Sequence, residues 1–227
     1  MILKKTYEYP TSTRASIDGL RHYTIDGNSV KLPSVTTVLG KTHPKEKEDS
    51  LQRWRDRVGH AEAKRITKEA ADRGTAMHKY LEKYCLCGGK HRDLTVAGDQ
   101  AKVMSDIIIE KGIENRIDEV YGVEATLYYP GLYAGSVDLV ARLDGELAIV
   151  DFKQTNKPKQ REWIGDYFLQ MAAYGMAHDA VYGTEINKGV ILMCSKDNYY
   201  QEFTIEGVDY RNAKHGFLSR LNTFYNL

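Results

Sequence analysis

The sequence predicts an α/β fold in which a mixed central β-sheet is flanked by helices. Helical patterns precede residue 117, three β-rich runs follow, and a helix, two strands and a last helix complete the chain. This order is typical of a sheet covered by helices. Two of the β-rich runs are strongly apolar, and the Asp144-Gly145 pair between them favours the tight turn of a β-hairpin. The 227 residues suffice for one core, or one core with a small extension.

The N-terminal elements are short. Residues 1–32 contain β-like pieces, and Asp26-Gly27 predicts a tight turn between two edge strands. Ser34 is a suitable cap for a helix that begins at Val35, although the β-branched residues that follow lower the helix propensity.

We expect a single domain over residues 1–227. It comprises an N-terminal β-rich or extended segment over 1–45, a helical region over 46–116 and an α/β core over 117–227. Within the helical region, the sequence predicts helices over 46–71, 71–85 and 95–116, with a loop over 85–91. Within the core it predicts strands over 120–129, 133–141 and 146–153, a basic loop over 154–161, a helix over 162–180, strands over 188–195 and 199–205, and a helix over 208–224.

Composition excludes a globally basic protein. The formal net charge is +1, with 42% hydrophobic and 28% charged residues, as in an ordinary soluble globular protein. Any nucleic-acid binding must therefore come from a local patch. Sixteen tyrosines are many for this length, and they serve either ordinary packing or the stacking of bases.

The cysteines and the N-terminus point to a reducing compartment. Cys85, Cys87 and Cys194 form neither an even disulfide framework nor a zinc-binding pattern. No apolar run approaches the roughly 18 residues that a membrane span needs. The N-terminus shows neither a signal-peptide core nor the Arg- and Ser-rich character of a transit peptide. We therefore expect a cytoplasmic protein.

Two acids and a lysine on the predicted hairpin form the main candidate site. Asp151 and Lys153 share one face of their strand, while Phe152 points the other way, and hairpin pairing brings Asp138 beside them. Two converging carboxylates suit a hard cation such as Mg²⁺, which keeps several waters. One such water is a potential nucleophile.

The alternative for this trio is a solvated polar face with a weak surface ion pair, which is the commoner meaning of Asp-x-Lys on a strand. Asp138 and Asp151, however, interrupt very apolar strands. A carboxylate in that setting needs a partner or a metal, so the site interpretation is favoured.

Two helical pairs add candidates. His78 and Glu82 lie four residues apart on one helix face, as do Gln170 and Tyr174 on a later helix. Taken alone, each pair is more often structural. A glutamine is nevertheless a good partner for a phosphate or a base edge.

The ordered set of these motifs is more specific than any one of them. It consists of Arg-Gly-Thr-x-x-His-x-x-x-Glu at 73–82, Gly-x-Val-Asp at 135–138, Asp-Phe-Lys at 151–153 and Gln-x-x-x-Tyr at 170–174. The set resembles the RecB-like branch of the PD-(D/E)XK nuclease superfamily over about residues 30–225. The resemblance implies a restriction-endonuclease-like core.

Within that branch the sequence most resembles the mitochondrial genome maintenance exonuclease family, through residues 32–39, 51–57, 149–159 and 169–174. Members of that family cut single-stranded DNA from free ends. Because the chain is compact and shows no organelle presequence, we expect a bacterial or bacteriophage relative. A phage-encoded protein would act in the bacterial host cytoplasm.

By this resemblance, His78, Asp138, Asp151 and the backbone carbonyl of Phe152 hold a metal ion, and Lys153 orients or deprotonates the attacking water. The metal would stabilise charge on phosphodiester oxygens and lower the pKa of a bound water. Burial beside a metal would disfavour the charged form of the lysine. An imidazole makes the site softer than oxygen ligands alone. We therefore expect activity with Mn²⁺ at least equal to that with Mg²⁺.

The remaining roles also follow from the resemblance. Gln170 and Tyr174 would position the strand or the lysine. Glu82 and Glu124 are weaker candidates that would hold His78 or an arginine. Relatives with an iron–sulfur cluster use four cysteines flanking the core, and the cysteines of this chain do not match that pattern, so we expect no cluster.

Substrate contacts are predicted from side-chain type. Hydroxyls and lysines bind phosphates without reading sequence, and an indole either stacks on a base or packs between helices. The charged segment 46–71 presents either a solvated face or a DNA contact, and it is placed to close over a strand. The predicted DNA-binding residues are Ser34, Thr36, Thr37, Trp54, Thr155, Lys157 and Lys159.

The favoured function is a metal-dependent exonuclease acting on single-stranded DNA in replication, recombination or repair. Two alternatives stay open: a structure-specific flap endonuclease, and a catalytically silent nucleic-acid-binding module of a recombination or packaging complex. A sequence-specific restriction enzyme is disfavoured because no extra recognition domain is visible. The expected partner is single-stranded DNA, with other replication or recombination proteins open as partners and no membrane.

Overall fold

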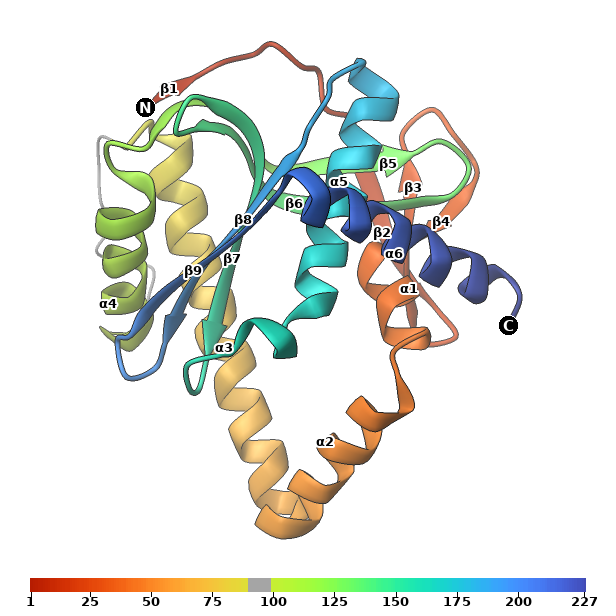
Figure 1. Ribbon diagram of the computed structural model, residues 1–227, viewed down its shortest axis with the longest axis vertical. Helices are drawn as coiled ribbons and strands as arrows, with labels where there is room; N and C mark the ends of the chain where they lie inside the picture. The colour runs from red at the N-terminus through yellow and green to blue at the C-terminus, as the bar shows by residue number, and fades with distance from the viewer. Residues whose placement is uncertain (90–98) are drawn as a thin grey trace.

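The computed structural model describes residues 1–89 and 99–227, and its centre is a six-stranded mixed sheet (Figure 1). The strands lie in the order β1-β5-β6-β7-β8-β9. β1 pairs with β5, and β7 with β8, in parallel, while the other neighbours are antiparallel. The predicted mixed sheet flanked by helices is therefore confirmed. Its strands are β1 Ile2–Leu3, β5 Ile117–Tyr129, β6 Tyr133–Leu143, β7 Glu146–Thr155, β8 Lys188–Ser195 and β9 Tyr200–Glu206.

Helices cover both faces of the sheet. α3 (His60–Leu86) and α4 (Asp99–Ile108) pack on one face, and α1 (Val35–Lys41), α5 (Gly165–Tyr182) and α6 (Gly207–Tyr225) pack on the other. Because both faces are buried, the central strands are apolar on both sides. In β7, for example, residue 149 faces the α5 side, while residues 148 and 150 face the α3 side.

A second, three-stranded antiparallel sheet is formed by β2 (Ser12–Ile17), β3 (Leu20–Ile25) and β4 (Lys31–Pro33). It confirms the predicted β-rich N-terminus. Asp26-Gly27 lies in the connection between β3 and β4, as expected, but the tightest turn is Asp18-Gly19, where both residues have positive φ (50° and 76°). An aspartate tolerates that conformation, which suits a two-residue hairpin turn.

The N-terminus of α1 is capped as predicted. Ser34 Oγ accepts a 2.9 Å hydrogen bond from the backbone N–H of Thr37. Val35 and Val38 are fully buried on the α5 and α6 side of the sheet. Tertiary burial together with the cap thus outweighs the low helix propensity of the β-branched residues.

The predicted break between the first two long helices was placed wrongly. α2 (Lys45–Val58) ends at Gly59, and α3 then runs unbroken for 27 residues through the expected boundary near residue 71. Gly59 has a φ of 86°, a conformation that glycine adopts without strain and that ends a helix. α2 buries none of its residues, and it projects from the body together with the first turns of α3 (Figure 1).

The other boundaries differ by a few residues. The helix predicted over 95–116 comprises α4 and a π-helix at Ile109–Ile113, and its residues 95–98 lie outside the described residues. The loop predicted over 85–91 begins after α3 ends at Leu86, and its residues 90–91 also lie outside the described part. A short 3-10 turn, Arg161–Trp163, precedes α5. None of the described helices is both long and apolar enough to cross a bilayer.

Candidate active site

The candidate site lies where two central strands separate. β6 and β7 pair from the hairpin turn as far as Leu139 and Val150. Beyond that pair, β6 continues beside β5 and β7 continues beside β8, each without the other as a partner among the described strands. We call this separation the fork. It opens directly at Asp138 and Asp151, so both acids stand at a gap inside the sheet.

Three carboxylates line up across the fork. Glu124 and Asp138 lie on β5 and β6 between the paired residues Val123–Leu139 and Ala125–Val137. Extending the β6–β7 register by one pair places Asp138 opposite Asp151. The hairpin predicted from the sequence therefore does bring the two aspartates together, and β5 adds a third acid to the row.

Asp138 is held from two sides. The backbone N–H of Phe152 donates a 2.8 Å hydrogen bond to Asp138 Oδ2, and His78 Nδ1 lies 3.4 Å from Asp138 Oδ1. Burial alone would raise the pKa of Asp138, but His78 and Lys153 outweigh it and hold the pKa below its usual range. Asp138 is thus an anion that α3 and β7 fix in place.

Asp151 and Lys153 form a buried ion pair beside it. The Lys153 ammonium contacts Asp151 Oδ2, and the Asp151 side chain is only 2% exposed. Burial raises the pKa of Asp151 to about 6 despite the nearby lysine. Burial would lower the pKa of Lys153, but Asp151 and Asp138 outweigh it and raise that pKa. The two carboxylates thus favour the ammonium form of Lys153.

The donor set fits a divalent cation. His78, Glu124 and Asp138 each offer one ligand atom, and these atoms lie within 4.8 Å of one another. In the described part of the chain, Asp151 Oδ2 receives no hydrogen bond of ordinary geometry although it is buried. One imidazole nitrogen with carboxylate oxygens is a set that binds Mn²⁺ and also suits Mg²⁺.

Glu124 reaches this set through an unusual backbone conformation. Its φ is 48° in the middle of β5, which is uncommon for a residue other than glycine and costs free energy. Ser136 Oγ donates a 2.9 Å hydrogen bond to its carboxylate. Partial burial and the charge of Asp138 raise the pKa of Glu124, and Glu82 adds a smaller effect in the same direction.

The sequence interpretation treated Glu124 as a weaker, supporting candidate, and the structure places its carboxylate among the donors. A signal was present in the sequence. Glu124 interrupts the apolar run Val120–Leu127 of β5 much as Asp138 and Asp151 interrupt theirs.

Gln170 and Tyr174 lie on α5, the helix that packs on one face of the sheet near the fork. Gln170 Nε2 donates a 3.2 Å hydrogen bond to the Tyr174 hydroxyl, and Tyr174 is only 3% exposed. The Tyr174 ring packs so closely on β6 that a Cβ added to Gly135 would lie 2.7 Å from Tyr174 Cε1. The glycine that precedes Asp138 in the sequence motif thus allows α5 to support the strand.

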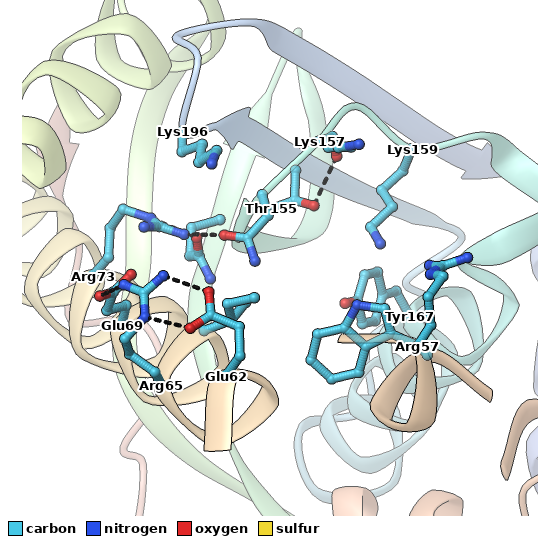
Figure 2. Close-up of a pocket in the computed structure, with 14 residues that line it drawn as sticks. Arg57, Glu62, Arg65, Glu69, Arg73, Thr155, Lys157, Lys159, Tyr167 and Lys196 are labelled. Atoms are coloured by element: carbon cyan, nitrogen blue, oxygen red, sulfur yellow. Dashed lines mark hydrogen bonds and ion pairs between the residues drawn. The ribbon is translucent and has the colours of Figure 1, made fainter. Parts of the chain in front are cut away.

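A cavity of about 700 Å³ adjoins the fork, between α2, α3, α5 and the loop after β7 (Figure 2). Trp54, Thr155, Lys157 and Lys159, four of the predicted DNA-binding residues, line it. The hydroxyl of Thr155 donates to the Lys157 carbonyl, so this side chain is already engaged. The cationic residues of the lining are Arg57, Arg65, Arg73, Lys157, Lys159 and Lys196.

The cations of the cavity are of two kinds. Arg65 is paired with Glu62 at 2.6 Å and also with Glu69, so its charge is neutralised locally. The other five form no ion pair with a carboxylate of the described residues. The cavity therefore carries a net positive potential although the whole chain is nearly neutral.

Arg73 links the cavity to β7. It donates a 2.9 Å hydrogen bond to Gln154 Oε1 and another to Asn156 Oδ1, and Gln154 Nε2 donates to the Ala70 carbonyl at 2.8 Å. α3 thus fixes the end of β7 directly after Lys153. The sequence interpretation gave Arg73 no role of its own, although it opens the Arg-Gly-Thr motif.

The three hydroxyl residues near α1 lie elsewhere. Ser34 caps the helix, and the Thr37 hydroxyl donates a 2.9 Å hydrogen bond to the Arg21 carbonyl, so both side chains are used internally. Thr36 is exposed. None of the three lines the cavity described above, and their contact with DNA stays a prediction.

Comparison with known sequences gives three relatives with one name, mitochondrial genome maintenance exonuclease 1. The mouse (Mus musculus) protein is 31% identical over 177 residues, covering 73% of this chain and 50% of that protein. The Xenopus tropicalis protein is 32% identical over 181 residues, covering 73% and 49%. The human (Homo sapiens) protein is 30% identical over 179 residues, covering 73% and 50%.

The chain is thus similar in sequence to these exonucleases. It spans about half the length of the curated relatives it matches. No family model matches the chain.

Two solved structures are similar at lower identity. One is the crystal structure of SSO0001, with 17% identity, 65% of this chain and 69% of that chain covered, and a TM-score of 0.31. The other is an alkaline exonuclease (LHK-Exo) from Laribacter hongkongensis, with 18% identity, coverage of 64% and 78%, and a TM-score of 0.31. Superpositions this loose do not bear on function.

Proposed function

We propose that this protein is a metal-dependent exonuclease that hydrolyses phosphodiester bonds of single-stranded DNA from free ends, in replication, recombination or repair. One observation carries the proposal: Asp138, Asp151 and Lys153 meet at the fork beside His78 and Glu124, and the fork adjoins a cationic cavity. The sequence similarity to exonucleases supports the same class of reaction.

The metal would be held by His78, Glu124 and Asp138, with Asp151 and the backbone carbonyl of Phe152 as further oxygen donors. A Mg²⁺ or Mn²⁺ ion bound there would supply a water of lowered pKa and stabilise charge on the phosphate. The carboxylates are suited to this task because strand backbone and His78 fix Asp138 before any ligand arrives.

Lys153 would act on the reacting groups directly. Its side chain is only 18% exposed, and its ammonium contacts Asp151. From that place it can donate a hydrogen bond to the attacking water or to a nonbridging phosphate oxygen. Gln170 and Tyr174 would hold β6 in position from the α5 side of the sheet, since Tyr174 packs on Gly135.

The cavity would hold the strand next to the scissile phosphate. Five cations without a carboxylate partner among the described residues provide phosphate contacts that do not depend on sequence. Trp54 adds an aromatic surface on which an unpaired base can stack. A single strand offers unpaired bases for such contacts, whereas a duplex hides them.

The test uses end-labelled linear and circular single-stranded DNA with Mg²⁺, Mn²⁺ or EDTA, comparing the wild type with Lys153→Ala. We expect metal-dependent loss of the linear strand only, and no loss with the variant. Cleavage of the circle would move the assignment to an endonuclease. If the pure wild type cleaves neither strand in either metal, the binding-module alternative replaces the enzyme.

A further inference from the structure

Tyr167 joins the catalytic lysine to the cavity. It lies in the first turn of α5, and the Lys153 ammonium is 5.0 Å from the centre of its ring. The same side chain lines the cavity and is half-buried. A cation this close to a ring face is attracted to it, so Tyr167 contributes to the position of Lys153.

The surroundings of Tyr167 are suited to bind both the base and the phosphate of a nucleotide. Figure 2 shows Arg57, Lys159 and Tyr167 at one end of the cavity, away from the Glu62, Arg65 and Glu69 cluster. Neither Arg57 nor Lys159 is paired with a carboxylate of the described residues. An aromatic face beside unpaired cations is the combination that proteins use for a base and its phosphate in single strands.

We propose that Tyr167 is the stacking platform for the nucleobase adjacent to the scissile phosphate, with Arg57 and Lys159 on the neighbouring phosphate. This inference rests on the proposed function. Because the ring also contacts Lys153, a base stacked there would place the reacting phosphate at the lysine and the carboxylates. Stacking is indifferent to base identity, so the subsite selects for the presence of an unpaired base and not for its sequence.

The nucleobase and Tyr167 can be removed separately. A series of linear single strands carries one abasic residue at successive positions, and cleavage at each phosphate is measured in single turnover. For the wild type, we expect the abasic residue to slow cleavage at one neighbouring phosphate by about 5- to 150-fold. Tyr167→Leu should slow cleavage of the intact strand by a similar factor and show no further penalty from the abasic residue.

Two variants control for indirect effects. Tyr167→Phe keeps the ring and should keep the abasic penalty. Trp163→Leu removes an aromatic residue that is 62% exposed but does not line the cavity, and it should behave like the wild type. A shift of Lys153 in Tyr167→Leu would slow intact and abasic strands equally, so it would leave the penalty unchanged.

An abasic penalty of equal size in the wild type and Tyr167→Leu, at every position, would overturn the subsite. A wild type that degrades no strand would instead contradict the proposed function. In that case, a strand containing 2-aminopurine is titrated in EDTA. Quenching of its fluorescence by the wild type and by Tyr167→Phe but not by Tyr167→Leu supports the stacking platform, and equal quenching by all three overturns it.

Discussion

The backbone N–H of Phe152 donates its hydrogen bond across the fork to the side chain of Asp138 in β6, at 2.8 Å, and not to a backbone carbonyl of that strand. A side-chain oxygen thus takes the place of the backbone carbonyl that would accept this bond between two paired strands. This satisfies a buried donor and fixes one carboxylate oxygen, while Asp138 Oδ1 faces His78. Asp138 therefore contributes to the fold through one oxygen and to the candidate metal site through the other. A substitution that keeps the first oxygen as an acceptor but removes the negative charge can separate the two roles.

Asp138→Asn should keep the fold and lose the activity. The amide oxygen of asparagine still accepts from Phe152, but the variant loses an anionic ligand. We expect a loss on the order of 100-fold or more in cleavage and in Mn²⁺ affinity, with a melting temperature close to that of the wild type. Calorimetric Mn²⁺ titration and end-label release measure both effects.

Asp144→Asn is the matched control for that substitution, since Asp144 lies in the turn of the same hairpin and pairs with Arg116 outside the site. It should leave Mn²⁺ affinity unchanged. Equal Mn²⁺ affinity in Asp138→Asn and the wild type would remove Asp138 from the ligand set.

Glu124→Gly should raise stability while it weakens metal binding. Glycine adopts the φ of 48° without the cost that glutamate bears, which is about 1 kcal/mol. The variant also removes a carboxylate from a cluster of like charges. We expect a higher urea midpoint together with weaker Mn²⁺ binding in the same preparation. A lower midpoint with intact Mn²⁺ binding would assign Glu124 a purely structural role.

Gly135→Ala should destabilise the protein because the new Cβ would lie 2.7 Å from the Tyr174 ring. Overpacking of this kind costs about 1–3 kcal/mol. Gly40→Ala is the control, since a Cβ there meets nothing within 4 Å. Urea unfolding of both variants measures the difference. Equal midpoints would show that α5 shifts away from the new Cβ without a loss of stability.

Stability should fall between pH 6.5 and pH 4 because of His178. This side chain is fully buried, accepts or donates hydrogen bonds with Tyr9 and Thr184, and burial lowers its pKa to about 4. The unfolded chain binds a proton near pH 6.5, while the folded chain does not. The stabilisation is therefore complete above about pH 6.5 and is lost as the pH falls, by at most about 1.4 kcal/mol per pH unit.

The variant that isolates this effect is His178→Gln, whose amide can still form a hydrogen bond with Tyr9 but does not titrate. Urea midpoints are compared with the wild type at pH 7, 6 and 5. We expect the wild-type advantage to shrink at each step. An advantage that is independent of pH would mean that His178 keeps its ordinary pKa in the folded protein.

The imidazole of His78 should determine the preference between Mn²⁺ and Mg²⁺. We expect cleavage with Mn²⁺ to be at least as fast as with Mg²⁺, and EDTA to abolish it. His78→Asp, which leaves only oxygen ligands, should shift the rate ratio towards Mg²⁺. Rates at matched free-metal concentrations test this, and a wild type active with Mg²⁺ alone would contradict the assignment of His78.

The core of the site was predictable because it depends on local pattern. Alternation along β7 fixes the shared face of Asp151 and Lys153, and the Asp-Gly turn brings Asp138 opposite them. Both relationships span few residues. The helix cap at Ser34 was predictable for the same reason.

Other parts depend on tertiary relationships that no local pattern contains. The approach of Glu124 requires a positive φ within a strand together with the β5–β6 register. The cavity requires the angle between α2 and α3, which Gly59 sets. The sequence pattern predicts one helix over 46–71, whereas Gly59 ends α2 and α3 continues past residue 71.

The fork gives the interior of the sheet a property that normally belongs to its margin. Where β6 and β7 part, neither pairs with the other, as at the edge of a sheet, although Ala134 of β6 forms a bridge with Ser34 on that side. The two aspartates at the fork are flanked on their outer sides by β5 and β8. Under the proposed function, access to the carboxylates would depend on the separation of β6 and β7, so it would depend on other positions than the ligands themselves.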